Sequence, residues 1–458
     1  MSDRMSVDYN RPDDPMNTSP DGVYYDNRIT PNIDNRIIYR QQLLEELDID
    51  ETRTNYCMRV YRHINPRNNK RIYRIGDKII LESRIYTDNP TSESIHRQAS
   101  ESDGESGLIF KAKLRVGNSI RSFVVKTIGN TEGEETQNMI DNKINNMKIL
   151  SDSVLMKKCP HFPILYSVLY CNKFKEFDNS PKPGSNTPDI NNENKRDFPS
   201  YIQIYDNNKL ISILTETANG NFNMFRSKFF DNSELLENAI AQIYISIMFF
   251  YKITGKYYGY ASSDNFLYHR ITPGGYFHYR IFGKNYFIKN LGYLWVLWNF
   301  KVNSLLPLGG SEIKIKHDSL RLDFKNILFT FSIYEPGETN INFDNEYPIQ
   351  LKNKILDLHN ILFRTVIPIT RDNINVFLIQ LLDKLEEHNI ILTNDKLDTK
   401  TVRILNEEPY IIKYFTEFNR PFNQIAKDIA ILGRFVTKVK ERRRRGGGAV
   451  KKILKSYK

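Results

Sequence analysis

The chain has 458 residues, 40% of them hydrophobic, and a formal net charge of +11. This length and apolar content allow one large domain or two modest ones, and the basic balance favours acidic partners such as nucleic acid or anionic lipid. The polar N-terminal stretch predicts no signal peptide, and no apolar run reaches the ~20 residues of a membrane span. The three cysteines lack zinc-site spacing, which favours reduced thiols in the cytosol or nucleus.

The first part of the chain is polar and then becomes rich in strand signals. Residues 1–55 lack sustained periodicity and are predicted to be mostly disordered, with a short helix at 40–49. Short β-branched segments predict strands at 71–76, 78–82, 108–116 and 122–129, with a turn at Gly117-Asn118. A helix is expected at 134–156, and 201–206 with 209–216 resembles another hairpin. Two polar insertions, at 86–107 and 174–198, are predicted to be loops.

From residue 220 onward, long apolar stretches predict helices. The longest begins at Ser233, a plausible N-cap, and is apolar on nearly every face, which is typical of a buried core helix. The predicted organisation is α+β, with a β-rich part at 56–219, a helical part at 220–437 and a basic flexible tail at 438–458. The cleft between the two parts is the expected ligand site.

Five short motifs follow one another along this framework. FVVK ends at Lys126, the predicted helix contains NNMKIL with Asn146, and a strand runs into Glu216-Thr217-Ala218. YYGYASSDNFLY contains Tyr258, Tyr260 and Asn265, and LWNFK contains Asn299. In order and spacing these motifs resemble the protein-kinase-like family, in particular the divergent kinase-like proteins of giant DNA viruses. The resemblance implies a two-lobed fold, with a small β-rich N-lobe carrying one main helix and a larger, mostly helical C-lobe.

The resemblance also implies roles for several residues. Lys126 would hold the ATP phosphates, and Asn146 takes the place of the glutamate that pairs with that lysine. Glu216 and Ala218 would form the hinge whose backbone meets adenine. His161, in the link that follows the helix, is interpreted as a packing or capping residue.

The catalytic positions are degenerate. Tyr258 stands at the histidine position and Tyr260 at the aspartate position, and a phenol with a pKa near ~10 keeps its proton at neutral pH. Asn265 matches a metal ligand, but Asn299 replaces the metal-binding aspartate, and Mg²⁺ prefers anionic oxygen. Asp264, beside Asn265, is a weak substitute for the missing base. No glycine-rich phosphate loop is present, although backbone groups of a serine-rich loop could still receive an anion.

These observations favour a pseudokinase that acts as a viral scaffold or regulatory binding protein, retains weak ATP binding, has a doubtful Mg²⁺ site and binds a protein partner. The expected location is the host cytoplasm or the virion, with the nucleus as an alternative. One alternative function is a weak or atypical serine/threonine kinase. Another is a nucleic-acid-binding or virion structural protein that acts through its basic tail; a solvated tail or a nuclear-targeting signal would have the same composition. The tail residues concerned are Arg442, Arg443, Arg444, Arg445, Lys451 and Lys452.

Overall fold

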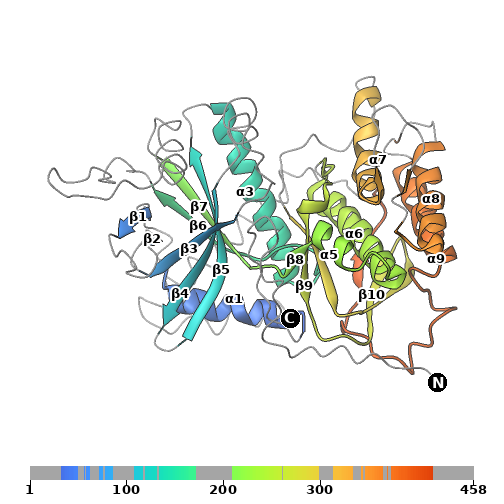
Figure 1. The fold of residues 1–458 in the computed structure, drawn as a ribbon, viewed down its shortest axis with the longest axis horizontal. Helices are drawn as coiled ribbons and strands as arrows, with labels where there is room; N and C mark the ends of the chain where they lie inside the picture. Colours follow the sequence, from blue (N-terminus) through green and yellow to red (C-terminus); the bar gives the residue numbers. More distant parts are fainter. Residues whose placement is uncertain are drawn as a thin grey trace, which may run out of the picture.

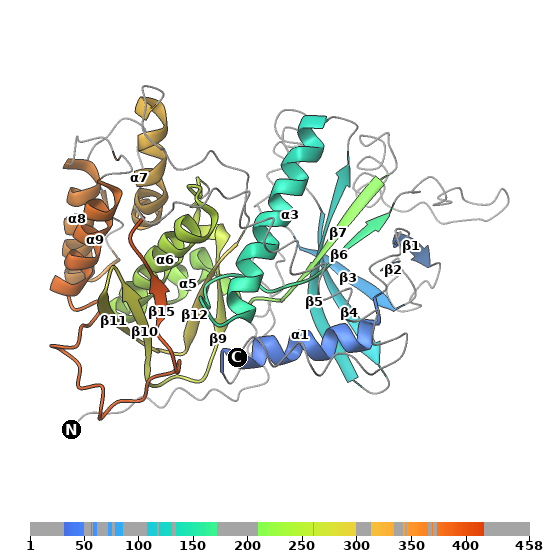
Figure 2. The same cartoon turned by 180° about the vertical axis from the view of Figure 1, so that it is seen from behind.

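The computed structural model describes residues 32–49, 56, 58–61, 72–75, 78–85, 108–116, 119–130, 134–171, 209–259, 261–298, 313–333, 342–343, 346–364, 369 and 373–415. It is a mixed α+β structure, as predicted. A β-rich half and a helix-rich half lie side by side (Figures 1 and 2). The basic tail and both polar insertions lie outside the described residues.

A seven-stranded antiparallel sheet forms the β-rich half. Its strands, in spatial order, are β1 (Met58–Tyr61), β2 (Ile72–Ile75), β3 (Ile79–Ile85), β4 (Leu108–Val116), β5 (Ser119–Asn130), β7 (Lys209–Thr215) and β6 (Leu165–Cys171). On β4, Phe110, Ala112 and Leu114 are buried at every second position, which is the alternation that predicted this strand. The strand predicted at 209–216 is confirmed as β7, which pairs with β5 and β6; residues 201–206 lie outside the described residues.

Two helices accompany the sheet. Helix α3 (Glu134–Leu155) connects β5 to β6, packs against α6 of the other half and buries Ile140, Ile144 and Met147 along one face. Helix α1 (Asp34–Leu47) lies in the segment predicted to be mostly disordered, and it is longer than the short helix expected there. Only a few side chains of α1 are buried, and one of them is an arginine, which is why its apolar pattern is weak in the sequence.

The longest helix of the second half is α6 (Ser233–Thr254), and it is buried on all sides as predicted. Its N-cap is Asn232 rather than Ser233, because the Asn232 side chain accepts a hydrogen bond from the Leu235 N–H at 3.1 Å. The helix ends at Gly255, whose φ of 65° is the left-handed conformation that glycine adopts at little cost. Within its described residues this half also contains the helices α5 (Phe222–Lys228), α7 (Ile313–Phe329), α8 (Ile349–Arg364) and α9 (Ile374–Glu387).

The second half also contains strands that the sequence analysis did not anticipate. They are β8 (Gly220–Asn221), β9 (Phe266–Arg270), β10 (Tyr276–Ile281), β11 (Lys284–Lys289), β12 (Tyr293–Leu297), β13 (Ser332–Ile333), β14 (Asn342–Phe343) and β15 (Tyr410–Ile412). They form two three-stranded sheets, β11-β10-β15 and β12-β9-β8, and the pair β13-β14. Phe282 and Gly283 both have positive φ, so β10 and β11 are joined by the two-residue turn typical of tight hairpins.

The core of the second half is aromatic. Phe225 makes edge contacts with Tyr268, Tyr293 and Trp295, with ring centroids 4.8–5.4 Å apart. Such pairs add stability beyond the apolar area they bury. These aromatic side chains therefore serve core packing.

The cysteines differ from the expectation of three reduced thiols. Cys159 is free and fully buried, and burial raises the pKa of its thiol. Cys171, at the end of β6, is disulfide-bonded. Tyr56, the residue before Cys57, donates its backbone N–H to the C=O of Tyr170 at 3.0 Å, which brings another part of the chain beside this strand end. Across the described residues, no helix has both the length and the apolar character needed to cross a bilayer.

Candidate functional site

Six of the predicted site residues lie in the described part of the chain. Lys126 is on β5, Asn146 is on α3, and Glu216 and Ala218 follow β7. Tyr258 and Asn265 lie in the loop that joins α6 to β9. The remaining candidates lie outside the described residues: Tyr260, Asn299, Arg442, Arg443, Arg444, Arg445, Lys451 and Lys452.

The loop between α6 and β9 is fixed by a buried carboxylate that the sequence analysis missed. Asp323 on α7 is fully buried, and its two oxygens accept from the backbone N–H groups of Tyr258 at 2.9 Å and Gly259 at 2.6 Å. The Tyr251 hydroxyl also donates to Asp323, at 2.9 Å. Burial raises the pKa of Asp323 to about 7, and these three hydrogen bonds oppose the rise. The loop therefore takes its shape from α6 and α7.

Tyr258 is a packing residue of this loop. Its side chain is fully buried, with its ring against Phe250 and Phe266. Its hydroxyl donates to the backbone C=O of Trp298, the last described residue before Asn299. The phenol therefore holds the loop against the end of β12.

Asn265, in the later part of the same loop, also binds Trp298 after β12. The C=O of Asn265 accepts from the Trp298 N–H at 2.8 Å, and its side-chain amide donates to the Ser262 hydroxyl at 2.8 Å. The structure thus brings Tyr258, Asn265 and the residue before Asn299 together. Asp264 is exposed and accepts from the Asn221 amide at 3.0 Å, which turns its carboxylate toward the start of α5.

Asn146 is paired with a lysine other than Lys126. Its amide oxygen accepts from Nζ of Lys256 at 3.4 Å, a long hydrogen bond between α3 and the segment that follows α6. Both side chains are buried, with 1% and 9% of their surface exposed. Lys126 itself is half-buried on β5, between Ile109 of β4 and Ile213 of β7.

In the segment after β7, the Glu216 side chain and the backbone groups of Glu216 and Ala218 have different surroundings. The Glu216 carboxylate is buried against Arg36 of α1, with Nε of Arg36 at 2.9 Å and a second guanidinium nitrogen on the other oxygen. Within the described part of the chain, neither the C=O of Glu216 nor the N–H of Ala218 makes a backbone hydrogen bond. A ligand could therefore be received by backbone groups here, while the Glu216 side chain is structural.

His161 is confirmed as a packing residue. Its Nδ1 donates to the Trp295 C=O at 2.7 Å, and Nε2 accepts from the Tyr279 hydroxyl at 2.7 Å. Burial lowers the pKa of His161 to about 4, so the ring is neutral and both nitrogens are engaged.

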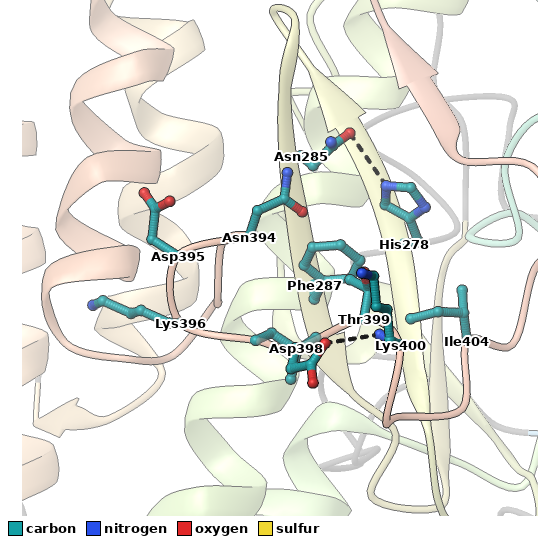
Figure 3. A pocket seen from close by; sticks show the side chains of 11 residues that line it. His278, Asn285, Phe287, Asn394, Asp395, Lys396, Asp398, Thr399, Lys400 and Ile404 are labelled. Atoms are coloured by element: carbon teal, nitrogen blue, oxygen red, sulfur yellow. Dashed lines mark hydrogen bonds between the residues drawn. The ribbon is translucent and has the colours of Figure 1, made fainter.

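A cavity of about 700 Å³ lies beside β10 and β11, and it shares no residue with the predicted site (Figure 3). His278 stacks on Phe287 at 4.7 Å and contacts Asn285, while Asp395, Asp398, Lys396 and Lys400 supply both signs of charge. The Lys396 ammonium binds the Glu386 C=O and the Asn389 side chain, at 2.8 and 2.7 Å. The cavity therefore presents no concentrated charge that would select a ligand.

In comparisons with known proteins, no protein-family model matches the chain, and no curated protein matches it. In the described residues, no group of three or more His, Cys, Asp and Glu side chains is arranged to hold a metal ion.

Replacing Tyr258 by phenylalanine is expected to lower the free energy of unfolding by about 1 kcal/mol, because the Trp298 C=O loses its donor. Urea denaturation monitored by circular dichroism measures this. Tyr414→Phe, at an exposed tyrosine, is the control and should change stability much less. An equal loss in both variants would contradict a specific role for the Tyr258 hydroxyl.

Proposed function

We propose that this chain is a catalytically degenerate protein-kinase-like protein that binds a nucleotide in its cleft and acts as a scaffold or regulatory binding protein. The observation that carries the proposal is the loop between α6 and β9. Asp323, Tyr258 and Asn265 hold this loop against the end of β12, so its shape is maintained. The tyrosine at the histidine position is packed into the core rather than available for chemistry.

The order of elements supports the proposed fold. The resemblance predicts a lysine-bearing strand, a helix, two further strands, a hinge, a long helix, the loop and then the segment with Asn299. The chain has β5, α3, β6, β7, Glu216–Ala218, α6, the loop and β12 in this order. The β-rich half beside the helix-rich half supports the two-lobed arrangement.

The residues present support binding better than catalysis. Phosphoryl transfer depends on positioning and on charge stabilisation by metal ions and lysine. At the positions that would supply carboxylates, the sequence has Tyr260, Asn299 and Asn146. A chain of this kind retains the cleft and loses most of the groups that accelerate transfer. The proposed setting, a giant-virus particle or the host cytoplasm, follows from the sequence resemblance alone.

The test is a thermal-shift titration of the full chain with ATP, with and without Mg²⁺. We expect ATP to raise the melting temperature of the wild type, because a ligand at 100 times its Kd stabilises the native state by about 2.7 kcal/mol. Lys126→Ala should reduce the shift, whereas Lys113→Ala, at a half-buried lysine of the neighbouring strand, should not.

Phosphate transfer to generic protein substrates should stay at background. Robust transfer that Lys126→Ala abolishes would establish an active kinase instead. The absence of any shift at millimolar ATP and adenosine would overturn the nucleotide-binding proposal.

A further inference from the structure

Asn146 has a buried hydrogen-bond donor. Its side chain is 1% exposed, and within the part of the chain that the structure describes its Nδ2 has no hydrogen-bond partner. Its oxygen accepts from the Lys256 ammonium, and the flipped amide would place two donors face to face, so the orientation is fixed by the lysine. An unsatisfied buried donor costs about 1–3 kcal/mol, and such groups are uncommon in folded proteins. The Asn146 donor therefore lacks the acceptor that a folded protein normally provides.

The surroundings of this donor are basic. Lys143 lies one turn before Asn146 on the same side of α3 and is 3% exposed. Lys256 is 9% exposed, and burial lowers the pKa of its ammonium. Ammonium groups and the amide N–H only donate hydrogen bonds, so the complementary ligand is an acceptor with negative charge.

This donor group lies next to the proposed cleft. Lys256 is two residues before Tyr258, whose hydroxyl reaches the C=O of Trp298 beside Asn299. Helix α3 lies between the large sheet and α6 (Figure 2). In the resemblance, Asn146 takes the place of a glutamate, and its amide offers a donor where a carboxylate would only accept.

We propose that Asn146 and Lys256, with Lys143 beside them, bind the phosphate end of a nucleotide or another polyphosphate anion without Mg²⁺. The inference rests on the proposed function as far as the nucleotide is concerned. The lysine charges would neutralise the phosphate oxygens in place of a metal ion, and the Asn146 amide would donate to one of those oxygens. An amide and ammonium groups that donate in this way repel a cation, so the same place does not suit a metal.

Isothermal titration calorimetry in EDTA, with ATP, tripolyphosphate and adenosine as probes, tests the proposal. The wild type should bind ATP and tripolyphosphate. Lys256→Met keeps the length of the side chain and removes its charge, and it should weaken both by about tenfold or more, the loss of one charge-assisted hydrogen bond. Asn146→Glu restores a carboxylate and should weaken both at least as much, while adenosine binding stays unchanged.

Two controls match these variants. Asn145→Glu adds the same charge to the exposed neighbouring position, and Lys148→Met removes an exposed lysine of the same helix. Both should change affinity by less than about twofold, because exposed charges interact weakly with a site. Circular dichroism melting curves confirm that each variant is folded.

The outcomes separate this inference from the proposed function. If ATP binds but Lys256→Met and Asn146→Glu bind it as the wild type does, or if binding requires Mg²⁺, the inference is wrong and nucleotide binding stands. If tripolyphosphate binds while ATP and adenosine do not, the anion site stands and the nucleotide proposal fails. If no probe binds with or without Mg²⁺, both fail and water alone satisfies Nδ2 of Asn146.

Discussion

Replacing Asp323 by alanine is expected to lower the free energy of unfolding by about 3–5 kcal/mol. The change removes the acceptor of the buried Tyr258 N–H and of the half-buried Gly259 N–H, and it leaves the buried Tyr251 hydroxyl with only the more distant Leu320 C=O at 3.3 Å. It also removes the two hydrogen bonds by which Asp323 joins α7 to the backbone of this loop, so the loop should lose its fixed shape. Guanidinium denaturation measures the first effect, and hydrogen exchange at Tyr258 and Gly259 measures the second.

Asp383→Ala, at an exposed aspartate of α9, is the matched control and should stay within about 0.5 kcal/mol of the wild type. Asp323→Asn keeps the shape of the side chain but offers one acceptor oxygen instead of two, so its loss should be intermediate. If Asp323→Ala costs less than about 1 kcal/mol, other contacts hold the loop and the role given to this carboxylate is wrong.

The second large effect is expected at Arg36. Its guanidinium donates to both oxygens of Glu216 and to the C=O groups of Pro160 and Phe162, the last two at 2.8 and 2.6 Å. Arg36→Met leaves an ionised carboxylate buried beside His269, which should cost about 3–5 kcal/mol of stability.

The double variant Arg36→Met/Glu216→Gln should recover part of this loss, since no unpaired charge remains, and the double-mutant cycle gives the coupling of the pair. Lys157→Met is the control: it breaks the exposed pair between Lys157 and Asp34 of the same helix and should cost less than about 1 kcal/mol. Equal costs at both pairs would contradict the importance of burial.

The Glu216 pair also predicts a pH dependence. Burial alone would raise the pKa of Glu216, but the charge and hydrogen bonds of Arg36, with His269 at 3.3 Å, hold it well below its usual value. The folded pKa is thus lower than the unfolded one, so the stability gained from ionisation is complete above about pH 5 and is lost as the pH falls. The stability difference between the wild type and Glu216→Gln should therefore shrink between pH 5 and pH 3 in denaturant titrations. A constant difference would contradict the depressed pKa.

The strands and helices that the sequence predicted well are those whose burial follows a simple period. On β4 every second residue is buried, and α6 is apolar all round, so both can be recognised without tertiary information. Helix α1 was not recognised at its full length because Arg36 holds it through an ion pair, which leaves no apolar period. The strands β9–β12 were missed, although their alternating aromatic residues and paired glycines indicate strands and turns. The prediction of a helical part from residue 220 onward rested on the long apolar stretches around them.

The candidate site also contains residues that local sequence reveals and residues that it does not. Tyr258 and Asn265 could be located from the sequence, because the loop motif that contains them is a local feature. The roles of Asp323 and Lys256 depend on residues far away in sequence. Asp323 does have a local signal, since it shares a helix face with Leu320, Phe324 and Ile327, where a lone carboxylate needs donors from elsewhere. Lys256 has no such signal, because its partner Asn146 is on α3, 110 residues away.

The contact between Arg36 and Glu216 also constrains how the protein is made. The two residues are 180 positions apart. At a synthesis rate of about 5–20 residues per second, α1 leaves the ribosome roughly 10–40 s before the carboxylate it binds. During that interval Arg36 is solvated, and α1 does not yet have the ion pair that compensates for its weak apolar face. The β-rich half therefore completes its folding only after β7 and the residue that follows it, Glu216, have been synthesised.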